Sequence, residues 1–255
     1  MVVKCDVIIG IGTIGGPLMR YLVEKGNNII VFDSDPKKIT EANDFFERNG
    51  LVDKVKLTSV LDIRDVKKIS DLIQYLSDNG LILSSVIITS YPRSAAYGVD
   101  FESVSAEDFC EHLASHVGGY FNCCRAFANY MAGTMGGSIV LFSSIYGSNS
   151  PRFEIYEGTA MTVPVEYAVS KAGIEHLARY CARYFSGKRV RFNSIAPGGV
   201  FDNQPQSFVE RYNFHKTGKG MLSPEDLFET VFFLISNGSS MINGQNIIVD
   251  DGWTL

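Results

Sequence analysis

Short apolar runs alternate with amphipathic segments along most of the chain, and this alternation predicts strands and helices in turn. A helical segment or helix-start signal follows each of the first six runs. Runs that are apolar at nearly every position are typical of parallel strands covered on both faces. The pattern therefore predicts an α/β fold with a doubly wound parallel sheet. The predicted strands are residues 7–9, 28–32, 55–57, 81–89, 139–142, 190–195 and 246–249.

A glycine-rich turn follows the first predicted strand and opens the first helix. It has the form Gly-x-Gly-x-x-Gly, and the second predicted strand after it ends in Asp33. In this context the glycines let the backbone approach a pyrophosphate at the helix N-terminus, and the acidic residue accepts hydrogen bonds from a ribose. This is the Rossmann dinucleotide fingerprint. The residues it assigns to cofactor binding are Gly10, Gly12, Thr13, Ile14, Gly15 and Asp33.

The residues after Asp33 bear on the choice between NAD and NADP. Ser34 and Asp35 come next, so no cation adjoins the position that a 2′-phosphate would take. Lys37 and Lys38 lie a little further on and keep the alternative open. The sequence favours NAD as the cofactor.

Ser144, Tyr167 and Lys171 are the candidate catalytic residues. Ser144 ends an apolar strand, and the tyrosine and lysine lie four apart in a predicted helix that runs to about Phe185. That spacing places both side chains on one helix face, where an ammonium favours the phenolate form of a tyrosine. Such a tyrosine can exchange a proton while the serine holds the substrate oxygen. The pattern indicates alcohol and carbonyl chemistry.

The Tyr-x-x-x-Lys spacing alone is weak evidence, because it occurs four times. The other pairs start at Tyr21, Tyr184 and Tyr212, and for most of them a half-buried tyrosine beside a solvated lysine is sufficient explanation. Only Tyr167 follows a strand that ends in two serines. This context favours the pair Tyr167 and Lys171.

Composition and charge restrict the classes of function. A chain of 255 residues without a linker or repeat predicts one domain, 1–255, with a small lid over 200–221 after the sixth strand. The net charge of −5 gives no support for nucleic-acid binding, and no apolar run is long enough to span a membrane. Five unpatterned cysteines and a strand-like start predict a cytoplasmic protein with reduced thiols. His112 and His116 lie one turn apart without a third ligand nearby, so no metal is predicted.

Basic residues gather in the segments expected to border the cleft. Arg93 follows the fourth strand, Arg152 lies in a polar insertion over 145–166, and Arg211, Lys216 and Lys219 lie in the lid. Arg93 and Arg152 are therefore predicted to bind an anionic substrate. The insertion is either a surface loop or a wall of the substrate site.

Together these pieces resemble the short-chain dehydrogenase/reductase family over nearly the whole chain. The resemblance gives Ser144, Tyr167 and Lys171 the family's catalytic roles, with Lys171 also holding the nicotinamide ribose. It implies that two long helices, 106–131 and 165–185, form a homodimer or homotetramer. Within the family, the segments 91–93, 156–158 and 201–205 resemble the flagellin-modification protein A type of oxidoreductase, from bacterial clusters that make surface sugars. The further cofactor contacts that the resemblance implies are Asp62, Ile63, Pro197, Gly198 and Val200.

His116 stands where the family has the asparagine of its proton relay. Histidine also donates and accepts hydrogen bonds, so it either substitutes in the relay or faces the substrate. The neighbouring Gly118 and Gly119 predict that the helix bends there or comes close to another group. His116 is accordingly a fourth candidate catalytic residue.

The predicted function is an NAD-dependent oxidoreductase that interconverts an alcohol and a ketone. The predicted substrate is a small sugar-like molecule, phosphorylated or nucleotide-linked, in surface-glycan biosynthesis. Two alternatives remain open: a non-catalytic NAD-binding sensor or scaffold, and a dehydrogenase of a neutral lipid or polyol.

Overall fold

The computed structural model describes residues 3–255 and contains the predicted alternation of strands and helices. One sheet holds all seven strands in the order β3-β2-β1-β4-β5-β6-β7, and every pair is parallel. The predicted doubly wound sheet is confirmed. The strands are β1 (Val3–Ile9), β2 (Ile29–Asp33), β3 (Val55–Val60), β4 (Leu81–Ile88), β5 (Gly137–Phe142), β6 (Val190–Pro197) and β7 (Asn246–Val249).

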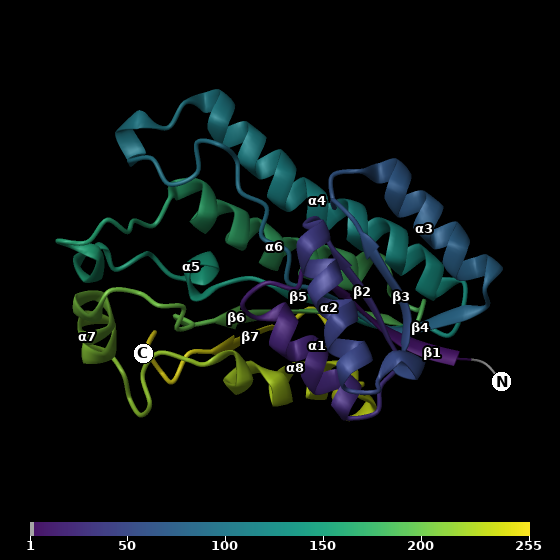
Figure 1. Ribbon diagram of the computed structural model, residues 1–255. Helices are drawn as coiled ribbons and strands as arrows, with labels where there is room; N and C mark the ends of the chain where they lie inside the picture. Colours follow the sequence, from purple (N-terminus) through teal and green to yellow (C-terminus); the bar gives the residue numbers. More distant parts are fainter. Residues whose placement is uncertain (1–2) are drawn as a thin grey trace.

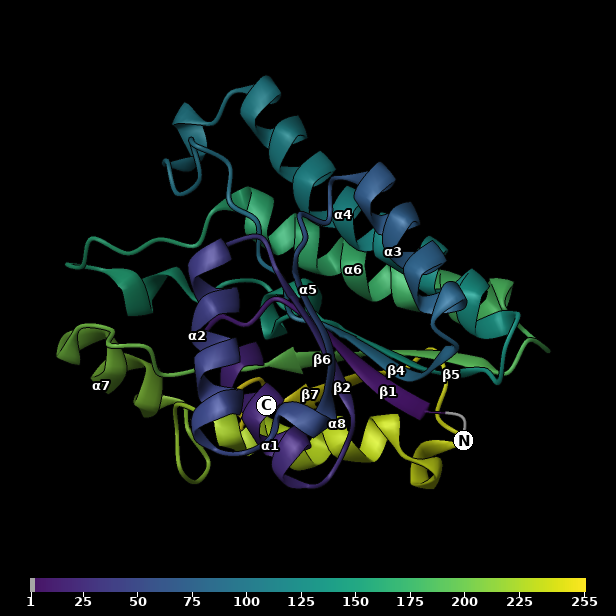
Figure 2. The same ribbon diagram turned by 45° about the vertical axis from the view of Figure 1, so that its right-hand side comes forward.

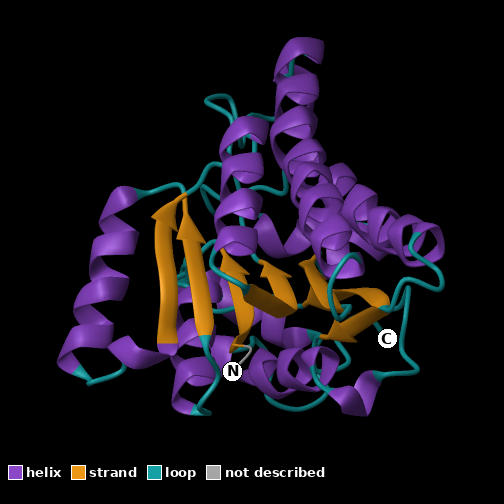
Figure 3. Ribbon diagram, turned by 90° about the vertical axis from the view of Figure 1, so that its right-hand side faces the viewer, coloured by secondary structure: helices purple, strands orange, loops and turns teal. Residues whose placement is uncertain are grey.

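The helices form a layer on each face of this sheet, as Figures 1 and 2 show. Helices α3, α4 and α6 cover one face, and α1, α2 and α8 cover the other. Figure 3 shows the strands between the two helical layers. The helices are α1 (Gly15–Glu24), α2 (Pro36–Arg48), α3 (Val66–Asp78), α4 (Ala106–Ala132), α5 (Ile145–Ser148), α6 (Val165–Tyr184), α7 (Gln206–Phe214) and α8 (Phe228–Ile235).

Local signals fix several helix starts. The Asp35 carboxylate accepts a hydrogen bond from Lys37 N at 2.9 Å and precedes a proline in the first turn of α2. Asp65 caps α3 and Ser105 caps α4 in the same manner. Side-chain oxygens at these positions satisfy backbone N–H groups that the first helical turn leaves unpaired.

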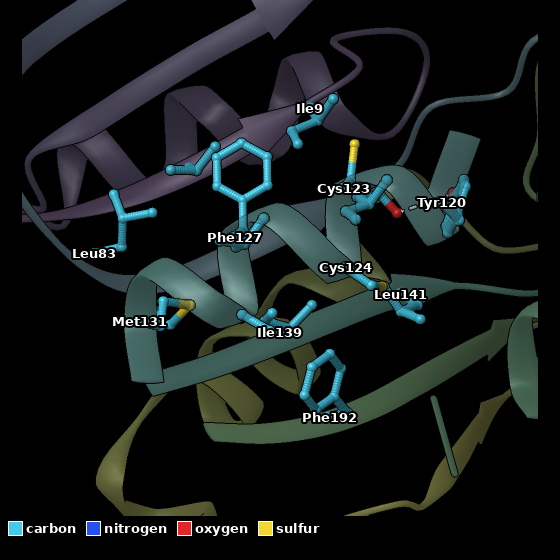
Figure 4. Close-up of a cluster of buried hydrophobic side chains, with 14 of the residues drawn as sticks. Ile9, Leu83, Tyr120, Cys123, Cys124, Phe127, Met131, Ile139, Leu141 and Phe192 are labelled. Carbon is cyan, nitrogen blue, oxygen red and sulfur yellow. Dashed lines mark hydrogen bonds between the residues drawn. The ribbon is translucent and has the colours of Figure 1, made fainter. Parts of the chain in front are cut away.

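The core on the α4 side of the sheet is built from apolar side chains of α4 and of the central strands (Figure 4). Phe127 and Met131 of α4 are fully buried against the sheet, where Ile139 and Leu141 of β5 face them. A buried aliphatic or aromatic side chain contributes roughly 1.5–3 kcal/mol by leaving water. This packing fixes α4 and β5, and both elements carry candidate site residues.

The order of β1 and β4 creates the position of the site. The chain reaches β2 and β3 on one side of β1 and then returns to β4 on its other side. In such sheets a crevice opens beyond the carboxyl ends of the strands where the winding reverses. The glycine-rich turn after β1 and the segment after β4 both begin at this edge.

Candidate active site

The glycine-rich turn between β1 and α1 forms a tight cradle that side chains would fill. Gly10 has φ +95°, and a Cβ there would lie 2.7 Å from Ser90 N. A Cβ on Gly15 would overlap the carbonyl oxygen of Gly10. Only glycine permits these approaches, so the turn can bring its backbone N–H groups close to a phosphate.

Asp33 ends β2 beside this cradle. Its Oδ2 accepts a hydrogen bond from Ile11 N at 2.7 Å, and its Oδ1 accepts one from Asp35 N at 2.9 Å. These bonds hold the carboxylate at the edge of the cavity. Lys38 reaches the same region, because its Nζ lies 3.6 Å from the point where a Cβ would stand if Gly12 carried one.

Asp62 and Ile63 follow β3 and lie in the same cavity. Asp62 is paired with Arg64, with 2.6 Å between Nη2 and Oδ2, and this bond lowers the pKa of the carboxyl group. Arg64 also lines the cavity, a placement that sequence reasoning missed.

Ser144 lies at the end of β5 and caps the short helix α5. Its Oγ accepts a hydrogen bond from Tyr146 N at 3.2 Å and is hydrogen-bonded to the hydroxyl of Tyr167. Lys171 lies one turn further along α6, where its Nζ donates to the carbonyl oxygen of Phe142 at 2.9 Å. The three candidate side chains therefore meet at the carboxyl end of β5.

The structure also separates the roles of the two adjacent serines. The hydroxyl of Ser143 lies 2.9 Å from Oε1 of Glu175, a buried residue of α6, while Ser148 donates to Oε2 at 2.7 Å. Ser143 thus joins β5 to α6, and Ser144 is the serine that meets the tyrosine. Sequence reasoning missed Glu175, because a glutamate eight positions after Tyr167 has no distinctive pattern.

Burial sets the proton affinities of the tyrosine and the lysine. It raises the pKa of Tyr167 to about 12, against the opposing effect of the hydrogen bond with Ser144. It lowers the pKa of Lys171 to about 7. The expectation that the neighbouring ammonium shifts the tyrosine toward phenolate is therefore wrong, because desolvation dominates. Burial thus brings the pKa of the lysine, and not that of the tyrosine, close to neutral pH.

One cavity of about 850 Å³ joins these features. It runs from the glycine-rich cradle and Asp33 to Ser144, Tyr167 and Lys171. The lining also includes Arg93. The remaining predicted cofactor positions that line it are Gly12, Thr13, Ile14, Pro197, Gly198 and Val200.

Aromatic side chains form much of the cavity wall around Tyr167. Two of them follow β4, two lie in the insertion after β5, and two belong to the lid helix α7. The insertion is therefore a wall of the site rather than a plain surface loop. Sequence reasoning singled out Tyr156 and the segment 91–93 after β4, named Tyr212 only for its spacing from a lysine, and did not single out the other three. These aromatic residues are Tyr91, Tyr97, Tyr146, Tyr156, Phe208 and Tyr212.

The lid is held over the turn that follows β6. The Tyr212 hydroxyl accepts a hydrogen bond from Gly199 N at 2.6 Å, and its ring stacks on Trp253 with centroids 4.9 Å apart. Trp253 Nε1 in turn donates to the carbonyl oxygen of Tyr212 at 2.9 Å. The lid is thus anchored to the C-terminal segment.

The structure does not bring every predicted cation to the cavity. Arg152 lies with its guanidinium carbon 4.9 Å from the ring centroid of Trp253 and is absent from the lining. In the lid, Arg211 donates to the carbonyl oxygen of Glu157 and Lys219 pairs with Asp226. Arg93 is the predicted substrate cation that the cavity contains.

His116 also lies outside the cavity lining, fully buried behind Tyr91, with ring centroids 5.1 Å apart. Helix α4 continues unbroken past it, so the glycines at 118 and 119 do not interrupt the helix. Gly119 has a packing role: a Cβ there would lie 2.5 Å from Ile63 Cδ1. Of the two predicted consequences of these glycines, the close approach is the one observed.

Within residues 3–255, no group of three His, Cys, Asp or Glu side chains is placed to hold a metal ion. The same described part of the chain contains no helix long and apolar enough to cross a membrane.

Comparison with known proteins agrees with this geometry. The family model described as enoyl-(acyl carrier protein) reductase matches residues 10–254. The post-translational flagellin modification protein A of Campylobacter coli is 32% identical over 96% of this chain and 95% of its own length. Glucose 1-dehydrogenase 2 of Bacillus subtilis is 27% identical, and the match covers 92% of this chain and 88% of the length of the relative.

A solved structure shows the same architecture. The short chain dehydrogenase from Leptospira borgpetersenii, crystallised with bound NAD⁺, superposes with a TM-score of 0.84 and is 28% identical in sequence. The match covers 99% of this chain and 93% of the Leptospira chain. Fold and site together define an oxidoreductase of the Rossmann type. The chain belongs to the short-chain dehydrogenase/reductase family, which confirms the resemblance seen in the sequence.

Proposed function

We propose that the protein is an NAD-dependent oxidoreductase that interconverts an alcohol and a ketone on a sugar-like substrate. One observation carries this proposal: a single cavity joins the glycine-rich cradle and Asp33 to Ser144, Tyr167 and Lys171. The cradle fits a dinucleotide, because Gly10 and Gly15 leave room where side chains would stand. The nicotinamide cofactor, when bound, supplies or accepts the hydride.

The chain's own residues handle the substrate oxygen and its proton. Ser144 holds the oxygen, and Tyr167 is protonated at neutral pH because burial raises its pKa to about 12. It can therefore give its proton to a carbonyl oxygen, after which Lys171 restores it. In alcohol oxidation the protons move the opposite way: Tyr167 gives its own proton to the neutral Lys171 amine as it takes the proton of the substrate hydroxyl.

The substrate class is inferred from the site and from relatives. The tyrosine rings that line the cavity present an apolar face and a polar hydroxyl, which suits a polyhydroxylated ring, and Arg93 suits a phosphate or carboxylate. The names of the Campylobacter coli and Bacillus subtilis relatives point to flagellin modification and to glucose. We therefore place the reaction in surface-glycan biosynthesis, on a phosphorylated or nucleotide-linked sugar. The five free cysteines suit the cytoplasm.

A panel assay tests this function. NADH formation is followed with sugar phosphates, nucleotide sugars, a neutral polyol and a lipid alcohol, and ketone reduction is followed with NADH. The proposal predicts turnover on a charged sugar. NAD binding without turnover on any compound would favour a sensor, and turnover confined to the polyol or lipid would favour the dehydrogenase of a neutral substrate.

Cofactor choice gives a first prediction. Asp33 should bond the ribose hydroxyls and repel a 2′-phosphate, so NAD(H) should bind more tightly than NADP(H). Asp33→Ala should reduce the ratio of the NADP(H) to the NAD(H) dissociation constant by about tenfold, because losing one hydrogen bond to a charged group costs about that much binding free energy. Titration of both cofactors measures the ratio.

Lys38 provides the matched variant, because its ammonium lies beside Gly12. In the Asp33→Ala background, Lys38→Ala should weaken NADP(H) binding more than NAD(H) binding. Tighter binding of NADP(H) than NAD(H) by the unmodified protein would refute the assignment.

Substrate charge gives a second prediction. Arg93 lies in the cavity with its guanidinium carbon 5.1 Å from the centroid of Tyr91, whereas Arg152 lies outside it. Arg93→Ala should raise KM for the charged substrate about tenfold and leave NAD affinity unchanged, since a charged hydrogen bond contributes roughly 1.5–3 kcal/mol. Arg152→Ala, the comparison variant, should have a smaller effect. Equal KM values for the sugar and its dephosphorylated form would contradict an anionic substrate.

Assembly gives a third prediction. Helices α4 and α6 expose apolar or aromatic side chains, among them Phe121, Val169, Tyr180 and Tyr184. We propose a closed homodimer or homotetramer in which these helices pair. The molar mass measured by light scattering at micromolar concentration should be a multiple of the 28.1 kDa mass of one chain. The Val169→Glu variant should have a lower molar mass than the wild type. A monomeric wild-type protein would contradict this assembly.

A further inference from the structure

The side chain of Glu175 lies buried between α6 and the one-turn helix α5. Glu175 is 3% exposed, and it does not line the cavity that contains the catalytic residues. A buried carboxylate is costly unless hydrogen bonds or an opposite charge compensate it, and an aliphatic side chain would fill the same place without that cost. A carboxylate at this place therefore indicates that its hydrogen bonds have a role.

The Glu175 carboxylate contacts α5 at both ends. Ser143 immediately precedes the helix cap Ser144, and its Oγ lies 2.9 Å from Glu175 Oε1. Ser148 is the last residue of α5, and its hydroxyl donates to Glu175 Oε2 at 2.7 Å. The helical turn between these contacts is the one that Ser144 begins. The two oxygens of one carboxylate thus hold the short helix that sets the position of the catalytic serine.

Gly147 permits this close approach of α5 to α6. A Cβ on Gly147 would overlap Glu175 Oε1. It would also lie 2.7 Å from Ser143 Oγ and 2.9 Å from the carbonyl carbon of Lys171. The chain therefore has no side chain at the one point of α5 where a side chain would push the carboxylate away from its partners.

The same contacts hold Lys171 by its backbone. Ser143 Oγ lies 3.0 Å from the carbonyl oxygen of Lys171, while the ammonium of this lysine donates to the carbonyl oxygen of Phe142 at 2.9 Å. Two consecutive residues at the end of β5 therefore bond the backbone and the side chain of the lysine. Glu175 lies one turn further along α6 and contacts the serine of this pair.

The hydrogen atoms of these contacts can be counted. The Ser143 hydroxyl has one hydrogen and two acceptors within reach, Lys171 O and Glu175 Oε1. Ser148 gives its own hydrogen to Glu175 Oε2 and accepts one from Asn246 Nδ2 at 3.1 Å. A glutamine at 175 would donate to Ser143 through its amide nitrogen and accept from Ser148 through its amide oxygen. Glutamine can therefore complete the set of bonds, whereas leucine can form none of them.

We propose that Glu175 is a positioning residue, whose contacts with Ser143 and Ser148 hold Ser144 and Lys171 in place for proton transfer through Tyr167. This role rests on the proposed oxidoreductase function. Glu175 acts through geometry rather than charge, because it is not among the groups that shift the pKa of Tyr167 or of Lys171. Small misplacements of catalytic groups lower the rate of a reaction strongly.

Glu175→Leu and Glu175→Gln together test the role. Glu175→Leu should lower kcat about tenfold or more and change KM and NAD affinity little, since the cavity lining is untouched. Glu175→Gln should keep kcat within about twofold of wild type, with the same pH profile, because its hydrogen bonds are retained. A residue that served only fold stability would lower Tm in Glu175→Leu and leave kcat of the folded protein unchanged.

Two further variants serve as controls. Arg179 Nη2 lies 3.7 Å from Glu175 Oε2, and Arg179→Ala removes this ion pair but leaves the serine contacts, so it should behave as wild type. Ser143→Ala removes one hydroxyl group and should lower kcat as Glu175→Leu does, which keeps the test available if the leucine variant does not fold. The effects of Ser143→Ala and Glu175→Leu should not add in the double variant, since both remove the same contact.

Crystal structures give a readout without turnover. The distance between Ser144 Oγ and the Tyr167 hydroxyl should lengthen in Glu175→Leu, or in Ser143→Ala, and stay unchanged in Glu175→Gln. An unchanged distance, wild-type kcat in the leucine variant, or equal losses with leucine and glutamine would overturn the positioning role while the oxidoreductase function stands. Failure of both the wild type and Arg179→Ala to turn over any compound of the panel would instead overturn the function itself.

Discussion

Tyr167→Phe should lower turnover by about 100-fold or more and change NAD affinity by less than about twofold. The substitution removes one hydroxyl group, which in the proposed mechanism gives a proton to the substrate oxygen or takes one from it. The ring remains, so its edge-to-face contact with Tyr91, with centroids 5.5 Å apart, is retained. Loss of a proton donor that acts only in the transition state lowers kcat and kcat/KM together. Steady-state kinetics and calorimetric titration of NAD measure the two effects.

The chain supplies a matched control for this variant. Tyr184 and Lys188 repeat the same spacing at the end of α6, with the lysine Nζ 5.8 Å from the ring centroid, but the tyrosine is 62% exposed. Tyr184→Phe should leave kcat unchanged. A Tyr167→Phe enzyme with undiminished turnover would reject the assignment of the acid and base.

Lys171→Met should abolish activity and stabilise the fold at the same time. In the proposed mechanism the Lys171 ammonium restores the proton on Tyr167, so its loss should lower kcat by about 100-fold or more. The family resemblance also implies that Lys171 binds the nicotinamide ribose. NAD affinity should therefore fall in this variant, whereas Tyr167→Phe should leave it nearly unchanged. Burial lowers the pKa of Lys171 from 10.5 to about 7, which means that the folded protein disfavours the charged form. Methionine removes that destabilisation, and the free energy of unfolding near pH 7 should rise by about 2 kcal/mol or more.

The pH dependence of stability provides a second test of the same group. The folded pKa lies below the unfolded value, so between about pH 7 and pH 10 the unfolded chain binds more protons at this lysine. Its contribution to the free energy of unfolding therefore rises with pH, by up to about 1.4 kcal/mol per pH unit. The gain from Lys171→Met should shrink accordingly between pH 7 and pH 8.5.

Only the difference between wild type and variant is informative here. Burial raises the pKa of Cys5 to about 11, so that thiol loses stabilising effect as pH rises above about 8.5, in both proteins. Denaturant unfolding at several pH values measures the difference. Lys188→Met, at an exposed lysine, is the control and should leave stability unchanged. A pH-independent gain from Lys171→Met would contradict a depressed pKa at this lysine.

The sequence was sufficient for the features that depend on local order along the chain. The apolar runs located all seven strands because the central strands are buried on both faces of the sheet and the edge strands β3 and β7 are partly buried. The glycine-rich turn and Asp33 were recognisable because a strand, a turn and a helix must follow one another to build the cradle. Tyr167 was separated from three other tyrosines by the serine-bearing strand before it. These predictions rest on neighbours in sequence.

Features that depend on contacts between distant segments were not predictable in this way. Arg152 stacks on Trp253, about a hundred positions away, and so leaves the cavity that its position in the insertion suggested. Glu175 and Glu166 are buried, although a glutamate on a helix is usually solvated. The raised pKa of Tyr167 and the lowered pKa of Lys171 follow from desolvation, which depends on the packing of α6 against β5. Such effects require the tertiary structure.

Hydride transfer is the central claim, and isotope transfer tests it most directly. Wild-type protein is incubated with NAD⁺ and a sugar alcohol that carries deuterium on the reacting carbon, and the NADH formed is examined by mass spectrometry. We predict one deuterium in the nicotinamide of each NADH formed, with formation slowed about 100-fold or more by Tyr167→Phe. NADH without deuterium, or deuterated NADH formed equally fast by Tyr167→Phe, would contradict the proposed chemistry at this site.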